Sequence, residues 1–169
     1  MSKVRVLILV ALPLLVADYA TKRAAARYLQ PPHSPHSVVG NAVRFTLAYN
    51  PQAVMSLPAG PHARWVLIGA TVIALLVLAH LLRTTGAGQR VRAIGLALVI
   101  GGAGGNLLDR VASGRGVVDF IDVGVGAWRF WTFNVADIGI DVGAALLALA
   151  MWRAAAHQRA GPSGGHRLG

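Results

Sequence analysis

Four strongly apolar stretches alternate with polar connections along this chain. They run from Val4 to Ala17, Trp65 to Leu82, Ala93 to Leu108 and Val135 to Trp152. A helix needs about 20 apolar residues to cross a bilayer, and the last three stretches approach that length. The first stretch is shorter, but its helical pattern continues through Asp18 to Ala26. The pattern predicts an α-helical membrane protein with four transmembrane helices.

The first stretch also has features of a secretory signal peptide. Lys3 and Arg5 precede its apolar core, and small residues follow it. An Asp at the end of such a core would be unusual, and the helical pattern does not stop there. We therefore favour a retained first span, in which Pro13 introduces a kink that membrane helices tolerate.

The polar connections predict a small β-sheet. The first has a Pro-rich loop at 31–36, an alternating segment at 43–47 and, from Asn50 to Ser56, a turn with a short amphipathic element. The second has β-prone segments at 117–125 and 127–133. We expect both connections to lie on the outer (periplasmic) membrane face. The aromatic residues suit either the membrane interface or packing within the sheet: Trp128, Phe130, Trp131 and Phe133.

The basic residues predict the orientation. They cluster before the first span, between the second and third, and after the fourth: Lys3, Arg5, Arg83, Arg90, Arg92, Arg153, Arg159 and Arg167. Basic loops face the cytoplasm, so we expect both termini there. None of the six Asp lies in the regions assigned to the cytoplasm, which supports this orientation. We assign residues 1–153 to a single four-span domain and 154–169 to a disordered, basic cytoplasmic tail.

Composition narrows the possible chemistry. Hydrophobic residues make up 55% of the chain and charged residues 13%, against about 25% charged in soluble domains. The net charge is +10, but single Arg residues at span ends indicate contacts with membrane lipids rather than with nucleic acid. The chain has neither Cys nor Glu, so thiol catalysis and zinc sites that need Glu are excluded. We expect no metal and no cofactor.

Several spans bring polar groups to a similar depth. Along the helices, Asp18 lies about 21 Å and Asn106 about 20 Å from the cytoplasmic ends, and Asp137 and Asp141 lie about 23 and 17 Å from theirs. In an apolar core about 30 Å thick, all four fall in the outer half. Ionisable groups at membrane depth are costly and indicate a functional site.

Asp119 and Asp137 are the best candidates for catalysis, because neither has a local basic partner such as those of Asp18 and Asp109. Two close aspartates share a proton, so that one acts as general base and the other as general acid. Each polar cluster could instead join spans through hydrogen bonds, an alternative that we weight heavily for Asp18 with Lys22 and for Asp109 with Arg110. A Ser/Lys dyad with Lys22, or a metal at the loop histidines, is a weaker alternative.

The combination of motifs resembles the bacterial lipoprotein signal peptidase (signal peptidase II) family. The matching motifs are Asp18-x-x-Thr21-Lys22, Asn50 with Ala53 and Ser56, Gly102-x-x-Gly105-Asn106-x-x-Asp109-Arg110, Val117-Val118-Asp119-Phe120 and Phe133-Asn134-x-Ala136-Asp137. The resemblance implies an aspartyl endopeptidase of the bacterial inner membrane. It would remove signal peptides from diacylglyceryl-modified prolipoproteins, cutting before the lipidated cysteine at the outer leaflet.

By the same resemblance, Asp119 and Asp137 would be catalytic. The residues that would bind substrate or support the dyad are Asp18, Lys22, Asn50, Asn106, Asp109, Arg110 and Asn134. The chain departs from the family pattern at Gln52, Met55, Ile138 and Asp141. We expect a monomer whose partners are prolipoprotein signal peptides and membrane lipids. The alternatives from other classes are a proton-relay or transport subunit and a non-catalytic scaffold.

Overall fold

The computed structural model describes residues 2–51 and 62–159. Within these ranges, four helical segments are long and apolar enough to cross a membrane: Lys3–Tyr28, Ala63–Thr84, Arg90–Ala112 and Val135–Gln158. The predicted four-helix membrane fold is therefore confirmed. Each helical segment extends beyond the apolar stretch that predicted it, because polar residues continue the helix at its ends.

The first helical segment is continuous through three parts. They are α1 (Lys3–Val6), a π-helical segment η1 (Leu7–Ala11) and α2 (Leu12–Tyr28). Pro13 lies inside this continuous helix, directly after the π-helical turn, where the pattern of backbone hydrogen bonds is already irregular. The sequence predicts a kink at this proline, and the structure has a π-helical turn directly before it.

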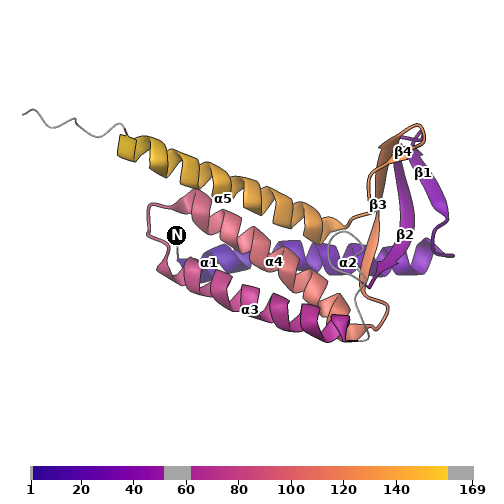
Figure 1. Ribbon diagram of the computed structural model, residues 1–169, viewed down its shortest axis with the longest axis horizontal. Coiled ribbons are helices and arrows are strands. Elements are labelled where there is room, and N and C mark those ends of the chain that lie inside the picture. Colours follow the sequence, from indigo (N-terminus) through magenta and orange to yellow (C-terminus); the bar gives the residue numbers. More distant parts are fainter. Residues whose placement is uncertain (1, 52–61, 160–169) are drawn as a thin grey trace, which may run out of the picture.

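The remaining helices are α3 (Ala63–Thr84), α4 (Arg90–Ala112) and α5 (Val135–Arg159). α4 lies at the centre, in contact with the first segment, α3 and α5 (Figure 1). Glycines permit its close approach to α5, because a Cβ at Gly95 would meet the Gly143 carbonyl at 2.9 Å. Small residues of this kind let membrane helices pack closely.

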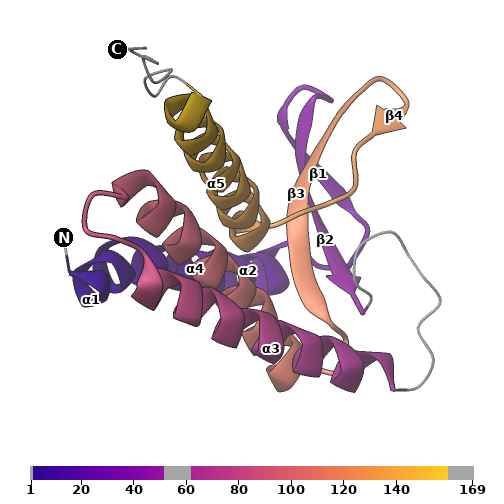
Figure 2. The ribbon, with the colours of Figure 1, turned by 60° about the vertical axis from the view of Figure 1, so that its left-hand side comes forward.

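A four-stranded antiparallel sheet covers one end of the helices. Its strands, in spatial order, are β1 (Pro35–Val39), β2 (Val43–Asn50), β3 (Val117–Val125) and β4 (Trp128–Arg129). β3 begins and ends as predicted. Figure 2 shows the sheet beside the start of α5, at the end of the bundle opposite to the N-terminus. The sheet therefore lies where the polar clusters of the helices end.

Three boundaries differ from the sequence predictions. Part of the expected loop at 31–36 belongs to β1, since Pro35 is the first residue of an edge strand, where proline is tolerated. The expected strand at 127–133 contains only β4 and an isolated bridge between Ile121 and Phe133. α5 continues to Arg159, so the first six residues of the expected tail, from Ala154 on, are helical. The amphipathic element predicted before Ser56 lies mainly outside the described residues.

The aromatic group lies at the free edge of the sheet. Phe130 stacks on Trp131 with ring centroids 3.8 Å apart and contacts Phe133 edge to face. Trp128 and Trp131 remain 69% and 65% exposed. The rings therefore pack on one another while both tryptophans stay accessible to the membrane interface.

Candidate active site

Asp137 stands at the N-terminus of α5 in a reciprocal capping arrangement. The Asn134 side-chain oxygen accepts a hydrogen bond from the Asp137 N–H at 3.0 Å. The Asp137 Oδ2 accepts one from the Asn134 N–H at 3.1 Å. This capping box fixes the first turn of α5 and with it the Asp137 carboxylate.

Asn134 also connects Asp137 to Asp119. Its side-chain Nδ2 donates to Asp119 Oδ1 at 2.6 Å, while its backbone N–H donates to Asp137. Asn134 is fully buried and Asp119 is 4% exposed. One residue thus holds both carboxyl groups, which come from a strand and from a helix. The two aspartates predicted to form a dyad lie in one site.

The position of Asp119 depends on the pairing of β2 with β3. Asp119 lies opposite Ala48, and Asn50 lies opposite Val117, so Asn50 is the diagonal neighbour of Asp119. The Asn50 Nδ2 donates to Asp119 Oδ2 at 3.3 Å. Gly116, at φ 94°, leads into β3 so close to the Asn50 carbonyl that a Cβ would clash with it. The turn before β3 therefore requires glycine.

Asn106 on α4 provides a second link to the dyad. Its Nδ2 donates to Asp137 Oδ1 at 2.9 Å. Its Oδ1 accepts hydrogen bonds from Lys22 Nζ at 2.8 Å and from Asn134 Nδ2 at 3.3 Å. Because Lys22 can only donate, it holds the amide oxygen of Asn106 and turns the amide N–H toward Asp137.

Lys22 is 3% exposed, and its ammonium group has three partners. Besides Asn106, these are Asp18 at 2.8 Å and Asp109 at 2.9 Å. The expected pair of Asp18 with Lys22 is present. Asp109, expected to pair with Arg110, forms its ion pair with Lys22 on another helix, and its charge also acts on Arg110. Buried charges need such partners, since an unpaired one would be strongly destabilising.

The same carboxylates anchor the neighbouring elements. Asp18 Oδ1 accepts a hydrogen bond from the Ala136 N–H at 2.8 Å, which satisfies an otherwise unpaired donor in the first turn of α5. Asp109 Oδ2 accepts one from the Val118 N–H at 3.2 Å, next to Asp119 in β3. Asp18 and Asp109 therefore position the two elements that carry the dyad.

Burial and the charge of Asp137 raise the pKa of Asp119 to about 6, against the opposing hydrogen bonds from Asn134 and Asn50. The negative charges of both carboxylates act on the Arg110 guanidinium, and that of Asp119 has the larger effect. A carboxyl group with a raised pKa, beside a second carboxylate and a cation, suits general acid and base chemistry.

The departures from the family pattern fall outside this network where the structure describes them. Ile138 is 44% exposed, and Asp141 is exposed without a hydrogen bond or ion pair to another described residue. Gln52 and Met55 lie outside the described residues. No group of three or more potential metal ligands occurs within residues 2–51 and 62–159.

Two contacts in this region were missed by the sequence analysis. The capping box at Asn134 has a recognisable signal, an Asn followed three residues later by an acid at the start of an apolar run. Arg64, in the first turn of α3, donates to the carbonyls of Arg110 and Val111 at the end of α4, at 2.7 and 2.9 Å. Nothing in the local sequence indicates that contact.

Comparisons with known proteins agree with the fold and the motifs. The family model described as Signal peptidase (SPase) II matches residues 10–153. A protein of Paraburkholderia phytofirmans named lipoprotein signal peptidase is 38% identical over 142 residues, which cover 83% of this chain and 80% of the relative. One of the same name from Paraburkholderia phymatum is 36% identical over 140 residues, covering 82% of both chains.

Two solved structures, both described as bacterial membrane enzymes, are similar in fold. The first has a TM-score of 0.82 at 25% identity and covers 94% of both chains. The second has a TM-score of 0.76 at 27% identity and covers 86% of this chain and 91% of the other. The similarity therefore includes the sheet as well as the helices.

Proposed function

Since this chain belongs to the lipoprotein signal peptidase family and is an aspartic peptidase of a multi-pass membrane type, we propose that it removes the signal peptide from diacylglyceryl-modified prolipoproteins. Cleavage falls directly before the lipidated cysteine. The observation that carries the proposal is the single residue, Asn134, that holds Asp119 and Asp137 in one buried site.

In the proposed reaction, Asp137 is the general base and Asp119 the general acid. Asp137 takes a proton from water as the water oxygen attacks the scissile carbonyl, and Asp119 gives its proton to the carbonyl oxygen. The tetrahedral intermediate then collapses and the C–N bond breaks: Asp137 gives the proton it took from water to the leaving amine, and Asp119 regains its proton from the hydroxyl group of the intermediate. The raised pKa of Asp119 supports its role as the acid, and the helix N-terminus at Asp137 favours a carboxylate there.

The polar neighbours have supporting roles in this proposal. Asn50, Asn106 and Asn134 orient the two carboxyl groups through their side-chain amides. Arg110 stabilises negative charge near the dyad. The ion pairs of Lys22 with Asp18 and Asp109 hold in place the elements that carry the dyad.

We place the protein in the bacterial inner membrane with both termini in the cytoplasm and the site at the outer leaflet. A signal peptide is itself a membrane helix, and its cleavage site would then lie level with the sheet-covered end of the bundle. The spacing of the basic residues supports this orientation. We further propose that the enzyme acts as a monomer in contact with membrane lipids.

The test replaces Asp119 and Asp137 separately by Asn, and each purified variant is assayed with a diacylglyceryl-modified precursor in detergent or lipid. We expect either change to lower kcat by about 10²–10⁴-fold, the range for loss of a general acid or base. Far-UV circular dichroism and the elution volume show whether each variant keeps its fold.

Asp141→Asn is the matched control, because it removes a carboxylate from the same helix one turn away without breaking a contact between described residues. It should keep cleavage near the wild-type rate. Full activity in a folded Asp119 or Asp137 variant would disprove the dyad mechanism, and cleavage at another bond would disprove the assigned substrate specificity.

A further inference from the structure

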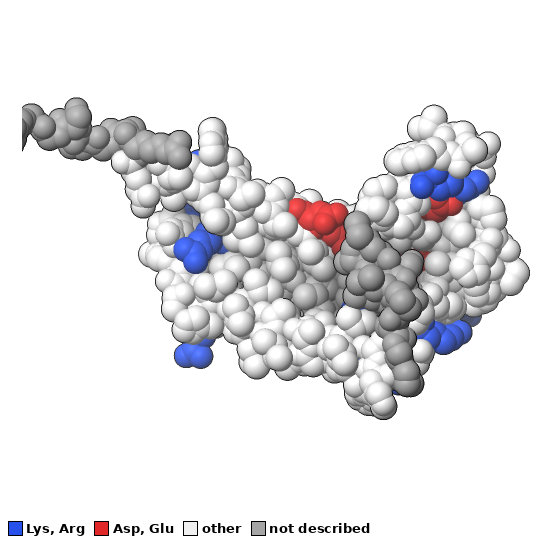
Figure 3. Space-filling view, in the orientation of Figure 1, with Lys and Arg blue, Asp and Glu red and all other residues white. Residues whose placement is uncertain are grey.

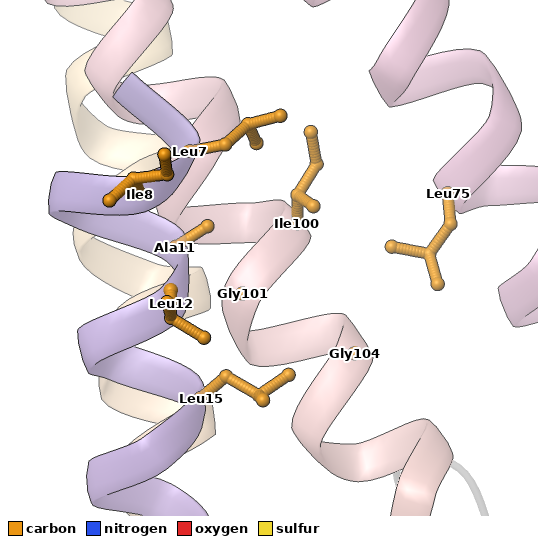
Figure 4. Close-up of a pocket in the computed structure, with 9 residues that line it drawn as sticks. All are labelled: Leu7, Ile8, Ala11, Leu12, Leu15, Leu75, Ile100, Gly101 and Gly104. Carbon is orange, nitrogen blue, oxygen red and sulfur yellow. The ribbon is translucent and has the colours of Figure 1, made fainter. Parts of the chain in front are cut away.

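An apolar groove of about 350 Å³ lies between the first helical segment and α3, away from the candidate active site. Figure 4 shows Ile8, Leu12 and Leu15 on one side and Leu75 on the other, with Gly101 and Gly104 of α4 between them. The dyad lies instead on the side of α4 that contacts α5. The groove therefore has no part in the proposed cleavage reaction.

The packing of the helices explains the groove. The first segment approaches α4 so closely that a Cβ at Gly101 would meet the Ala11 carbonyl at 2.8 Å. α3 also packs on α4. The helices meet at one end, where Lys3 Nζ donates to the Thr85 carbonyl and Val6 and Leu82 share a buried cluster. Farther along, glycines on α4 leave space between them.

The end at which these helices meet is basic. Arg5 stands one turn before Ile8, Arg83 lies in the last turn of α3, and both are exposed. The contact between Lys3 and Thr85 brings these two helix ends together. Figure 3 shows basic atoms at this end as well as on the sheet, while the acidic atoms on the visible face lie farther toward the sheet. The entrance to the groove thus favours an anion.

The depth of the groove fits an acyl chain from the leaflet at the basic end. Leu7 and Leu15 lie about 6 and 18 Å along the helix from Lys3. One leaflet of a core about 30 Å thick has a depth of about 15 Å. A chain whose headgroup lies near Arg5 would therefore extend along most of the groove.

We propose that this groove binds an anionic glycerophospholipid. One acyl chain lies over Gly101 and Gly104, and Arg5 and Arg83 hold the phosphate. In the orientation proposed above, this lipid belongs to the cytoplasmic leaflet, opposite to the leaflet of the substrate's diacylglyceryl group. Bilayer lipids supply this chemistry directly, and attraction to each basic residue near the surface is worth about a fivefold gain in affinity.

Native mass spectrometry of the delipidated full chain in detergent tests the proposal. The protein is titrated separately with dioleoylphosphatidylglycerol and with dioleoylphosphatidylcholine, which have identical acyl chains. We expect tighter binding of phosphatidylglycerol. Arg5→Gln combined with Arg83→Gln should lower its affinity by about fivefold per arginine and should lower that of phosphatidylcholine less, because the choline cation offsets the charge of its phosphate.

Gly104→Leu tests the groove itself. A Cβ there meets only the flexible end of Leu15, at 3.2 Å, so the new side chain can occupy the groove. Gly104→Leu should weaken the binding of both lipids. Gly69→Leu is the control, because that position on α3 faces open space. Leu12→Trp, at the half-exposed rim, fills the groove by another route if Gly104→Leu does not fold.

Three results would overturn the proposal. The first is equal affinity of the wild-type protein for the two lipids, and the second is equal lipid binding by folded Gly104→Leu and Gly69→Leu. The third is a dimer that the groove-filling variants abolish and that added lipid does not displace, since the groove would then bind a second copy. Cleavage of a lipidated precursor, which uses the other side of α4, shows that the variants are folded.

Discussion

Asp119 lies on β3 with 4% of its surface exposed, next to the carboxyl group of Asp137. Burial and that neighbouring charge raise the pKa of Asp119 from 3.8 to about 6. Between these two values the folded state binds more protons than the unfolded state, so the free energy of unfolding decreases as the pH rises. Above pH 6 the protein carries the full cost of an ionised Asp119.

Asp119→Asn should therefore stabilise the protein at pH 8 and have little effect on stability near pH 4. A pKa difference of about two units corresponds to about 3 kcal/mol, and we expect a gain of about 1–3 kcal/mol because the new amide alters the hydrogen bonds with Asn134 and Asn50. Thermal unfolding in detergent at several pH values measures this effect. An equal change in Tm at pH 4 and pH 8 would contradict it.

Asp122, on the same strand, is the control with the opposite sign. Although burial raises the pKa of Asp122, hydrogen bonds from Arg129 and Thr46 and the charges of Arg44 and Arg129 lower it overall. The stability that Asp122 contributes is present above its unfolded pKa and is lost as the pH falls. Asp122→Asn should therefore destabilise the protein most at pH 8.

The sequence predicts the residues of the candidate site, but only some of the contacts between them. Asp18 and Lys22 are four residues apart on one helix, so their ion pair follows from helical geometry. Asp109 has Arg110 next to it, yet it pairs with Lys22 from another span. Adjacent residues on a helix point in different directions, and the choice of partner depends on how the helices pack.

At the scale of elements, contact between α4 and α5 determines where Asp137 lies. A Cβ at Gly102 would clash with the backbone carbonyl of Ala136, the residue before Asp137. A rigid backbone atom cannot move aside as a flexible side chain can. The first turn of α5 must therefore shift if Gly102 is replaced by a larger residue.

We expect Gly102→Ala to lower the free energy of unfolding by about 1–3 kcal/mol, the usual cost of overpacking. It should also lower kcat strongly, because displacing a catalytic group by about 1 Å can cost about 10²-fold in rate. Gly69→Ala is the matched control, since its Cβ would meet nothing within 4 Å. The measurements are Tm and the kinetics of precursor cleavage, and wild-type kinetics in Gly102→Ala would contradict this account.

The elements themselves were predictable to different degrees. The composition of residues 117–125 predicts β3 correctly, and the length of the apolar stretches predicts the helices. β1 was not predicted, because its Pro and His residues have little strand preference and only pairing with β2 makes it a strand. The segment at 127–133 was over-predicted, since aromatic residues favour strands in general but this segment pairs at few positions.

On the scale of the whole molecule, the protein has two different ends. The chain begins at one end of the bundle, and α5 also finishes there, whereas the sheet and the dyad lie at the other (Figures 1 and 2). Lys22 forms its ion pairs near the sheet end. Arg5 and Arg83 are exposed at the opposite end. This polarity separates the proposed catalytic site from the proposed lipid site.

The two ends predict a definite topology. A fluorescent reporter that folds only in the cytoplasm should be active when fused after Arg90, at the start of α4, and after Arg153, near the end of α5. A reporter enzyme that is active only outside the cytoplasm should work when inserted near Ser34, between α2 and β1. The physical reason is that the basic turns resist transfer across the membrane. The reverse pattern would put the dyad on the cytoplasmic side, and cleavage at the outer leaflet would then be impossible.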